Sequence, residues 1–304
     1  MGGGSWDSTA YSTYAKSRGY STTTSTYVGA DGINYAVDTL SSGYSAQDLF
    51  KERKLHEKLN PYKVMRECND SDEHPNTVPV ILALDVTGSM GPAAAEVAKK
   101  LNEVMSKLYE RVTDVEFMIM AIGDLAYDSA PIQISQFEAD IRVAEWLDKV
   151  YFEHGGGGNL FESYTAAWYM GVRHMMLDSW KRDKKGIMIT IGDEPLNPYL
   201  PMVQLANVTG DNLQANIETK DLYPEAIKKF DIYHLAVDDR ATSYVNYSMD
   251  IQKSFGAYLD ENHLKVVKLS DICDTIVGIV ENAVKTNSDE MRPEFITYEN
   301  EISW

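Results

Sequence analysis

Short, continuous apolar runs recur along the chain and predict strands that are buried on both faces, as in a parallel sheet. These runs cover residues 78–84, 115–122, 187–191, 232–237 and 265–269. A weaker run at 132–137 predicts a short edge strand. The region 195–220 shows no single period, and we expect an irregular or helical insertion there.

Between these runs, apolar residues recur every three or four positions, which is typical of helices with one buried face. The predicted helices cover residues 46–62, 92–109, 140–150, 161–180, 224–230, 242–259 and 272–284. Pro92 suits the first turn of its helix. Because strands and helices alternate, we expect an α/β, three-layer Rossmann-like fold with a mostly parallel sheet between helices.

The first 45 residues differ from the rest, because they are rich in Ser, Thr, Tyr and Gly and nearly lack large aliphatic residues. Such a segment buries too little apolar surface to offset its ordering entropy, so we favour a disordered N-terminal arm. The alternative is an adhesive arm that orders against a partner or in an oligomer through its tyrosines, Tyr11, Tyr14, Tyr20, Tyr27, Tyr35 and Tyr44. We predict four parts: the arm 1–45, a short helix and linker at 46–77, the main domain 78–285 and a polar tail 286–304.

The charge of the chain limits the classes of function that are possible. The chain has 28 Lys and Arg residues and 46 Asp and Glu residues, so its net charge is −18. Nucleic-acid binding and attachment to a membrane surface both need a basic face, so we expect neither. No apolar run reaches the length of a membrane span, and residues 1–6 do not resemble a secretory signal. Two distant cysteines, Cys68 and Cys273, are expected to be reduced thiols of a cytoplasmic protein.

Polar residues gather where the predicted strands end, which is where open α/β sheets bind ligands. Asp85, Thr87 and Ser89 follow the first strand, and Asp193 follows the strand at 187–191. Carboxylate and hydroxyl oxygens are the ligands of a hard cation, so we expect Mg²⁺, or alternatively Mn²⁺ or Ca²⁺. A glycine run at 155–158 allows another backbone segment to approach this site closely.

The segment Asp85-Val86-Thr87-Gly88-Ser89 resembles the Asp-x-Ser/Thr-x-Ser motif of von Willebrand factor type A (VWA) domains, where it begins the metal-ion-dependent adhesion site (MIDAS). The order of strand, motif, helix, strand, glycine loop, helix and strand ending in Gly192-Asp193 is also similar over residues 78–284. The resemblance implies that Thr87 and Ser89 bind the ion directly, and that Asp85 and Asp193 bind it directly or through water. A partner's carboxylate would complete the coordination.

The chain departs from the family pattern at the glycine loop, where a threonine ligand usually follows two glycines. Gly158 or Asn159 stands there, and the carbonyl oxygen of Asn159 or the carboxylate of Glu162 is the expected substitute. This arrangement is similar to that of stand-alone type A proteins of bacteria and phages. Asp124 is either a further acid of the site or a turn residue, and we favour the turn.

We expect no enzymatic activity, because phosphatases of the haloacid-dehalogenase type need an acid where this chain has Thr87. The favoured function is a metal-dependent protein-binding module whose partner, another protein, presents Asp or Glu. Two alternatives stay open: a structural or assembly protein, for example of a phage virion, that uses residues 1–45, and an adaptor of an AAA-type ATPase.

Overall fold

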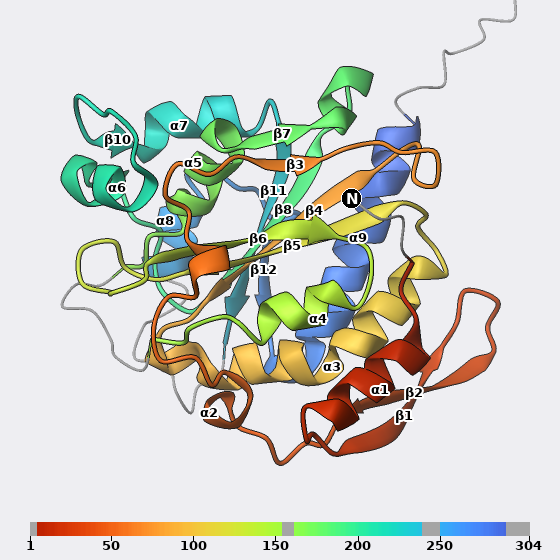
Figure 1. Cartoon of the computed structure of the whole chain (residues 1–304). Coiled ribbons are helices and arrows are strands. Elements are labelled where there is room, and N and C mark those ends of the chain that lie inside the picture. Colours follow the sequence, from red (N-terminus) through yellow and green to blue (C-terminus); the bar gives the residue numbers. More distant parts are fainter. Residues whose placement is uncertain (1–4, 154–160, 239–249, 290–304) are drawn as a thin grey trace, which may run out of the picture.

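The computed structural model describes residues 5–153, 161–238 and 250–289. A six-stranded sheet of order β12-β11-β8-β4-β5-β6 forms its centre (Figure 1). Neighbouring strands are parallel except for the pair of β5 and β6, which is antiparallel. The strands are β4 (Val78–Asp85), β5 (Val115–Ile122), β6 (Ile132–Glu138), β8 (Gly186–Gly192), β11 (Phe230–Val237) and β12 (Leu264–Val267). The predicted α/β class, parallel core and edge strand are confirmed.

Helices cover both faces of the sheet (Figure 1). On one face lie α3 (Gly91–Tyr109), α4 (Arg142–Leu147) and α9 (Ile272–Asp289). On the other lie α5 (Thr165–Arg173), α7 (Thr219–Ala226) and α8 (Gln252–Phe255). No helix in these described ranges is long and apolar enough to cross a membrane.

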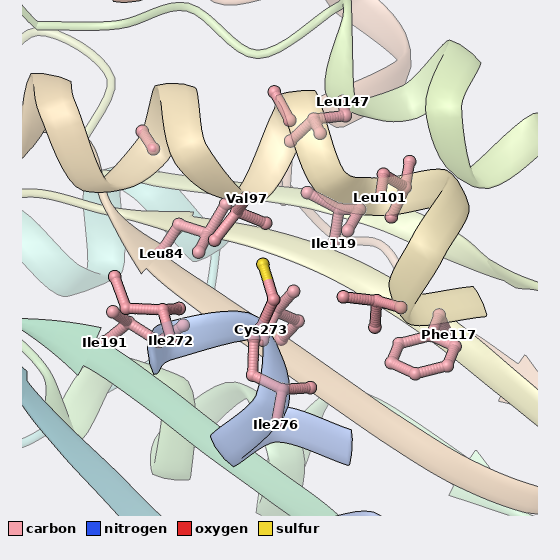
Figure 2. Close-up of a cluster of buried hydrophobic side chains, with 14 of the residues drawn as sticks. Leu84, Val97, Leu101, Phe117, Ile119, Leu147, Ile191, Ile272, Cys273 and Ile276 are labelled. Carbon is pink, nitrogen blue, oxygen red and sulfur yellow. The ribbon is translucent and has the colours of Figure 1, made fainter. Parts of the chain in front are cut away.

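Each core strand supplies both halves of the core, because alternate side chains of a strand point to opposite faces. On β4, Leu82 and Leu84 belong to the cluster under α3 and α9, whereas Ile81 and Ala83 belong to the cluster under α5. Figure 2 shows Leu84 among side chains from neighbouring strands and from both covering helices. Burial on both faces explains why the sequences of these strands are continuously apolar.

The N-terminal residues are ordered, so the favoured prediction of a disordered arm is wrong for residues 5–45. They form α1 (Ser8–Ser17) and an antiparallel hairpin of β1 (Thr22–Val28) and β2 (Asn34–Leu40), which lie outside α3 (Figure 1). Tyr11, Tyr20 and Tyr27 are buried. Composition misled here because the aromatic rings find their apolar partners in the rest of the chain.

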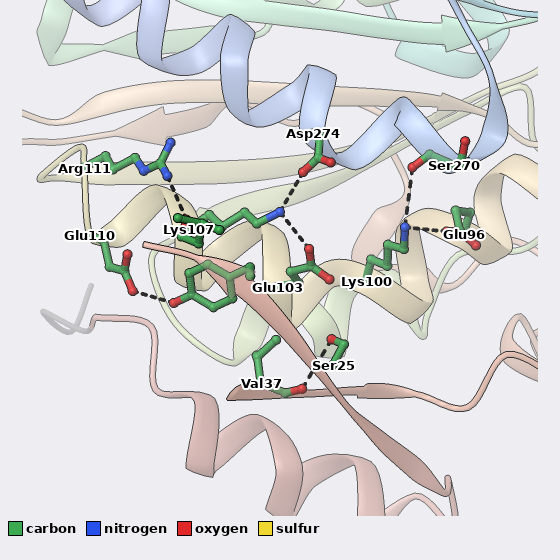
Figure 3. Close-up of polar contacts among 12 residues, drawn as sticks. Ser25, Val37, Glu96, Lys100, Glu103, Lys107, Glu110, Arg111, Ser270 and Asp274 are labelled. Atoms are coloured by element: carbon green, nitrogen blue, oxygen red, sulfur yellow. Dashed lines mark hydrogen bonds and ion pairs between the residues drawn. The ribbon is translucent and has the colours of Figure 1, made fainter. Parts of the chain in front are cut away.

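Polar contacts tie this N-terminal layer and α9 to opposite sides of α3 (Figure 3). The Trp6 indole N–H donates to Asn102 Oδ1 at 2.8 Å, and the Tyr27 hydroxyl donates to Glu110. On the side of α9, Lys107 Nζ lies 2.6 Å from Asp274 Oδ1, as Figure 3 shows. The Arg111 guanidinium pairs with Glu281 of α9 at 2.7 Å. Helix α3 is therefore enclosed between the sheet, α9 and the N-terminal layer.

The segment before the sheet differs from the prediction of one helix at 46–62 and a linker. Only α2 (Ala46–Leu49) and a 3₁₀ turn, η1 (Glu57–Leu59), form, because the charged stretch between them has little apolar surface to bury. The stretch predicted as a linker contains β3 (Arg66–Cys68), which pairs in parallel with β7 (Met175–Leu177).

Three predicted helices also have different bounds. The helix expected at 161–180 is limited to α5, because β7 and a 3₁₀ segment, η3 (Asp178–Arg182), follow it. Helix α7 begins at Thr219, before the predicted start at Pro224, and α8 covers only part of 242–259 within the described residues. The insertion contains β9 (Tyr199–Leu200), α6 (Met202–Thr209) and β10 (Ile217–Glu218).

Candidate metal-binding edge of the sheet

The loops after β4 and β8 meet because these two strands are neighbours in the sheet. Leu84 pairs with Ile191, so Asp85 and Asp193 leave the sheet at the same edge. The Ser89 hydroxyl donates a hydrogen bond to Asp193 Oδ1 at 2.9 Å. Two residues that are far apart in the sequence and that were both predicted as ligands are therefore in direct contact.

Asp85 is fully buried, and three donors hold its carboxylate. The Thr87 backbone N–H and hydroxyl donate to Oδ1 at 2.9 and 2.6 Å. The Tyr164 hydroxyl donates to Oδ2 at 2.7 Å. Tyr164 packs directly on the backbone of Gly192, where a Cβ atom would overlap its ring. Glycine at the end of β8 thus lets Tyr164 reach Asp85 and fix its orientation.

Three further acidic side chains at this edge have a buried carboxyl oxygen without a hydrogen-bond partner among the described residues. These oxygens are Asp124 Oδ2, Glu162 Oε2 and Glu194 Oε2. Buried polar atoms are nearly always hydrogen-bonded in folded proteins, so unpartnered carboxylate oxygens mark a place for a cation, water or ligand donor. Glu162 was predicted as a site residue, whereas Glu194 was not.

The acids at this edge disfavour one another's charged forms. Burial, followed by the charge of Asp193, raises the pKa of Asp85 to about 7. Burial and then Asp85 raise the pKa of Glu162 to about 10, and burial and then Asp193 raise that of Glu194 to about 7. Burial also raises the pKa of Asp128 to about 6. A bound cation would offset this repulsion, because a nearby positive charge favours ionised carboxylates.

The donor set fits a hard cation that keeps part of its water shell. Within the described ranges, no three Asp, Glu, His or Cys side chains are gathered closely enough to hold an ion among themselves. The hydroxyl groups of Thr87 and Ser89 lie beside Asp85 and Asp193, respectively. An ion at this edge would therefore use hydroxyl and water oxygens beside one or two carboxylates, a set that suits Mg²⁺.

The remaining sequence candidates have different outcomes. Asn159 lies outside the described residues. Asp124 forms the predicted turn, since its Oδ1 accepts the Ala126 N–H at 2.8 Å, but its other oxygen faces no partner among the described residues. Tyr164, Glu194 and Asp128 were not predicted as site residues from the sequence. Only Glu194 carried a local signal, because it follows Asp193 directly.

The cation-free protein is expected to lose stability as the pH rises from about 5 to about 8. An acid whose pKa is higher in the folded than in the unfolded state binds extra protons when folded, so its effect on stability becomes unfavourable as it ionises. With the pKa of Asp85 at about 7, this residue alone contributes a loss of about 2 to 4 kcal/mol in the free energy of unfolding, and Glu162 and Glu194 add to it. Urea unfolding in EDTA at several pH values measures this change in the free energy of unfolding.

Two comparisons control this measurement. Glu162→Gln removes one of the repelling acids and should flatten the dependence on pH, and saturating Mg²⁺ should do the same. A stability in EDTA that stays constant or rises over this range would contradict the charge arrangement described here.

No protein-family model and no curated protein sequence matches this chain. Solved structures resemble it at low identity. The open conformation of the pilus adhesin SpaC from Lactobacillus rhamnosus GG has a TM-score of 0.45 and 14% identity, over 70% of this chain and 30% of that one. The vWF domain of the type V pili tip protein Mfa5 from Porphyromonas gingivalis has a TM-score of 0.41 and 12% identity. This similarity covers 72% of this chain and 97% of the Mfa5 domain chain.

A third solved structure is proximal thread matrix protein 1 from the mussel byssus, with a TM-score of 0.40 and 10% identity. That similarity covers 68% of this chain and 48% of the mussel protein. The chain thus spans 30% of the length of the pilus adhesin and about half of the mussel protein.

Proposed function

We propose that this chain is a non-enzymatic, Mg²⁺-dependent protein-binding module of the VWA type. The ion sits at the carboxyl ends of β4 and β8, and an Asp or Glu of the partner protein provides one of its ligands. The observation that carries the proposal is the contact of Ser89 with Asp193 at 2.9 Å, beside the fully buried Asp85. This contact joins the two segments whose sequences resemble MIDAS loops.

The residues have separate roles in the proposed site. Thr87 and Ser89 supply neutral hydroxyl oxygens, and Asp85 and Asp193 supply charge directly or through water. Glu162 is buried nearby with one oxygen that has no partner among the described residues, which suits a role as an acceptor for a water bound to the ion. When bound, the ion supplies a positive charge that attracts the partner's carboxylate. A ligand bond of this kind gives affinity and orientation from a small contact area.

The two alternative functions have less support. An assembly arm needs tyrosines that are free to bind another molecule, but Tyr11 and Tyr20 are buried in the cluster that includes α3. Tyr27 is also buried, and its hydroxyl donates to Glu110 of the same chain. No feature of the described residues favours an ATPase adaptor in particular. The two cysteines are free and buried, which fits the proposed location in the reducing cytoplasm.

Selection of random displayed peptides on the immobilised full chain tests the proposed function. In Mg²⁺ we expect the enriched peptides to share an Asp or Glu, and we expect EDTA to release them. Changing that acid to its amide should abolish binding, because an amide oxygen carries no charge to bind the ion.

A matched pair of serine variants provides the control. Ser89→Ala removes a proposed ligand and should lose peptide capture, whereas Ser17→Ala, at the exposed end of α1, should retain it. Peptides that bind equally well in EDTA, or that bind Ser89→Ala unchanged, would refute a metal-mediated contact.

A further inference from the structure

A cavity of about 350 Å³ opens at the end of the sheet opposite the candidate metal edge. Its wall includes Val78, the first residue of β4, and Lys185, which directly precedes β8. Because β4 and β8 are parallel, their starts lie at the same edge. Strand β4 has 8 residues, so about 25 Å separate this cavity from Asp85.

The charge of this cavity is opposite to that of the whole chain. Its charged wall residues are Arg111, Arg182, Lys184 and Lys185, and no carboxylate of the described residues lines it. The chain as a whole carries a net charge of −18. Arg111 follows α3, and the other three cations lie in the single segment 182–185, so two segments place four cationic side chains around one cavity of an acidic protein.

Arg111, Arg182 and Lys185 form ion pairs with carboxylates that do not line the cavity. Arg111 contacts Glu281 at 2.7 Å, Arg182 contacts Asp70, and Lys185 Nζ lies 3.4 Å from Asp231. Arg182 also donates to the Thr77 carbonyl at 2.8 Å. A guanidinium has five N–H donors, so these bonds leave donors for a ligand. The pairs reduce the positive charge but also fix the geometry of the donors.

Ser179 provides a second and independent sign of a ligand site. It belongs to η3, lines the cavity and is 1% exposed. Its hydroxyl oxygen is buried without a hydrogen-bond partner among the described residues. A buried hydroxyl normally has a partner, so this unpartnered donor and acceptor at the cavity wall suits contact with a ligand.

We propose that this cavity binds a small phosphate-bearing molecule. A phosphate group has several acceptor oxygens and up to two negative charges, which match guanidinium, ammonium and hydroxyl donors that converge from several sides. The volume lies within the range of small-molecule sites. The ligand is either inorganic phosphate or a small phosphate ester, since both present the same group to these donors.

Isothermal titration calorimetry on the full chain tests this proposal, in EDTA and at low ionic strength. The titrants are inorganic phosphate, glycerol phosphate and, as a monoanion control, acetate. We expect one site for at least one of the two phosphates and no heat from acetate. If only the ester binds, the organic part also contacts the wall. Because no divalent cation is present, the result is independent of the proposed metal site.

Variants assign the binding to the cavity. Lys184→Gln with Lys185→Gln should weaken binding about tenfold or more, because two charge-assisted contacts are lost. Ser179→Ala should weaken it about two- to tenfold, the effect of one hydrogen bond. The control Lys220→Gln with Lys253→Gln removes the same charge from exposed positions in α7 and α8 and should change binding less than about twofold.

Circular dichroism shows whether each variant is folded, and Ser179→Ala, the smallest change, tests the cavity if the double lysine variant does not fold. Absence of heat from both phosphates overturns the proposal. So does phosphate binding that the Ser179 and double lysine variants leave unchanged, or an acetate affinity equal to that of phosphate.

Discussion

Asp85→Asn is expected to weaken Mg²⁺ binding by about a hundredfold or more while making the cation-free protein more stable. The loss follows because the variant removes the central charge of the proposed site, and changes even to groups behind metal ligands cost about 10- to 100-fold. The gain follows because Asp85 is fully buried and burial and Asp193 raise its pKa to about 7. At about pH 8 the neutral amide should add about 1 to 3 kcal/mol to the free energy of unfolding.

Titration calorimetry with Mg²⁺ and urea unfolding in EDTA measure the two effects separately. The amide oxygen of the variant could still accept the hydrogen bonds that Thr87 donates to Asp85, so the loop should remain in place. Asp221→Asn, at an exposed position of α7, is the matched control and should change neither quantity appreciably. If Asp85→Asn bound Mg²⁺ as tightly as the natural chain, the ion would bind elsewhere or not through this carboxylate.

Deletion of residues 1–45 is expected to destabilise the whole chain by several kcal/mol and to promote aggregation. Residues 5–45 cover the outer side of α3, and their removal exposes apolar side chains of the core cluster under that layer. Tyr11→Ala is a smaller version of the same change. The ring is 3% exposed and packs beside Trp6 with ring centroids 5.7 Å apart, so we expect a loss of about 3 to 5 kcal/mol.

Urea unfolding followed by circular dichroism measures the effect of both changes. Tyr35→Ala, in the same N-terminal layer but 38% exposed, is the control and should cost less than about 1 kcal/mol. A deletion variant that unfolds at the same urea concentration as the full chain would show that the N-terminal layer is an independent arm after all.

The fold class was predictable because strands buried on both faces must be apolar along their whole length. The apolar run at 78–84 predicts a strand buried on both faces, and β4 is such a strand. The bounds of β5, Val115 and Ile122, agree with the sequence prediction. Helix α3 was predictable for a similar reason, because its apolar stripe has the period of a helix and Pro92 marks its start. These signals are local, so no knowledge of the partners of each segment was needed.

The N-terminal layer and β3 were not predictable, because their order depends on contacts with distant segments. Tyr11 and Tyr20 belong to the same apolar cluster as α3, a surface that the composition of their own segment does not reveal. Similarly, Arg66–Cys68 becomes a strand only because Met175–Leu177 lies beside it. The helical pattern over 161–180 was outweighed by the backbone hydrogen bonds of this small sheet.

The α/β class, the apolar strands and the oxygen-rich loop at Asp85, Thr87 and Ser89 could be predicted without a structure, because each depends on neighbouring residues and their periodicity. The contact of Ser89 with Asp193, the orientation of Asp85 by Tyr164 and the place of Tyr11 and Tyr20 in the core emerge only from the folded chain. The physical reason is that burial, pKa shifts and hydrogen bonds across strands depend on distances in space, which the order of residues does not specify.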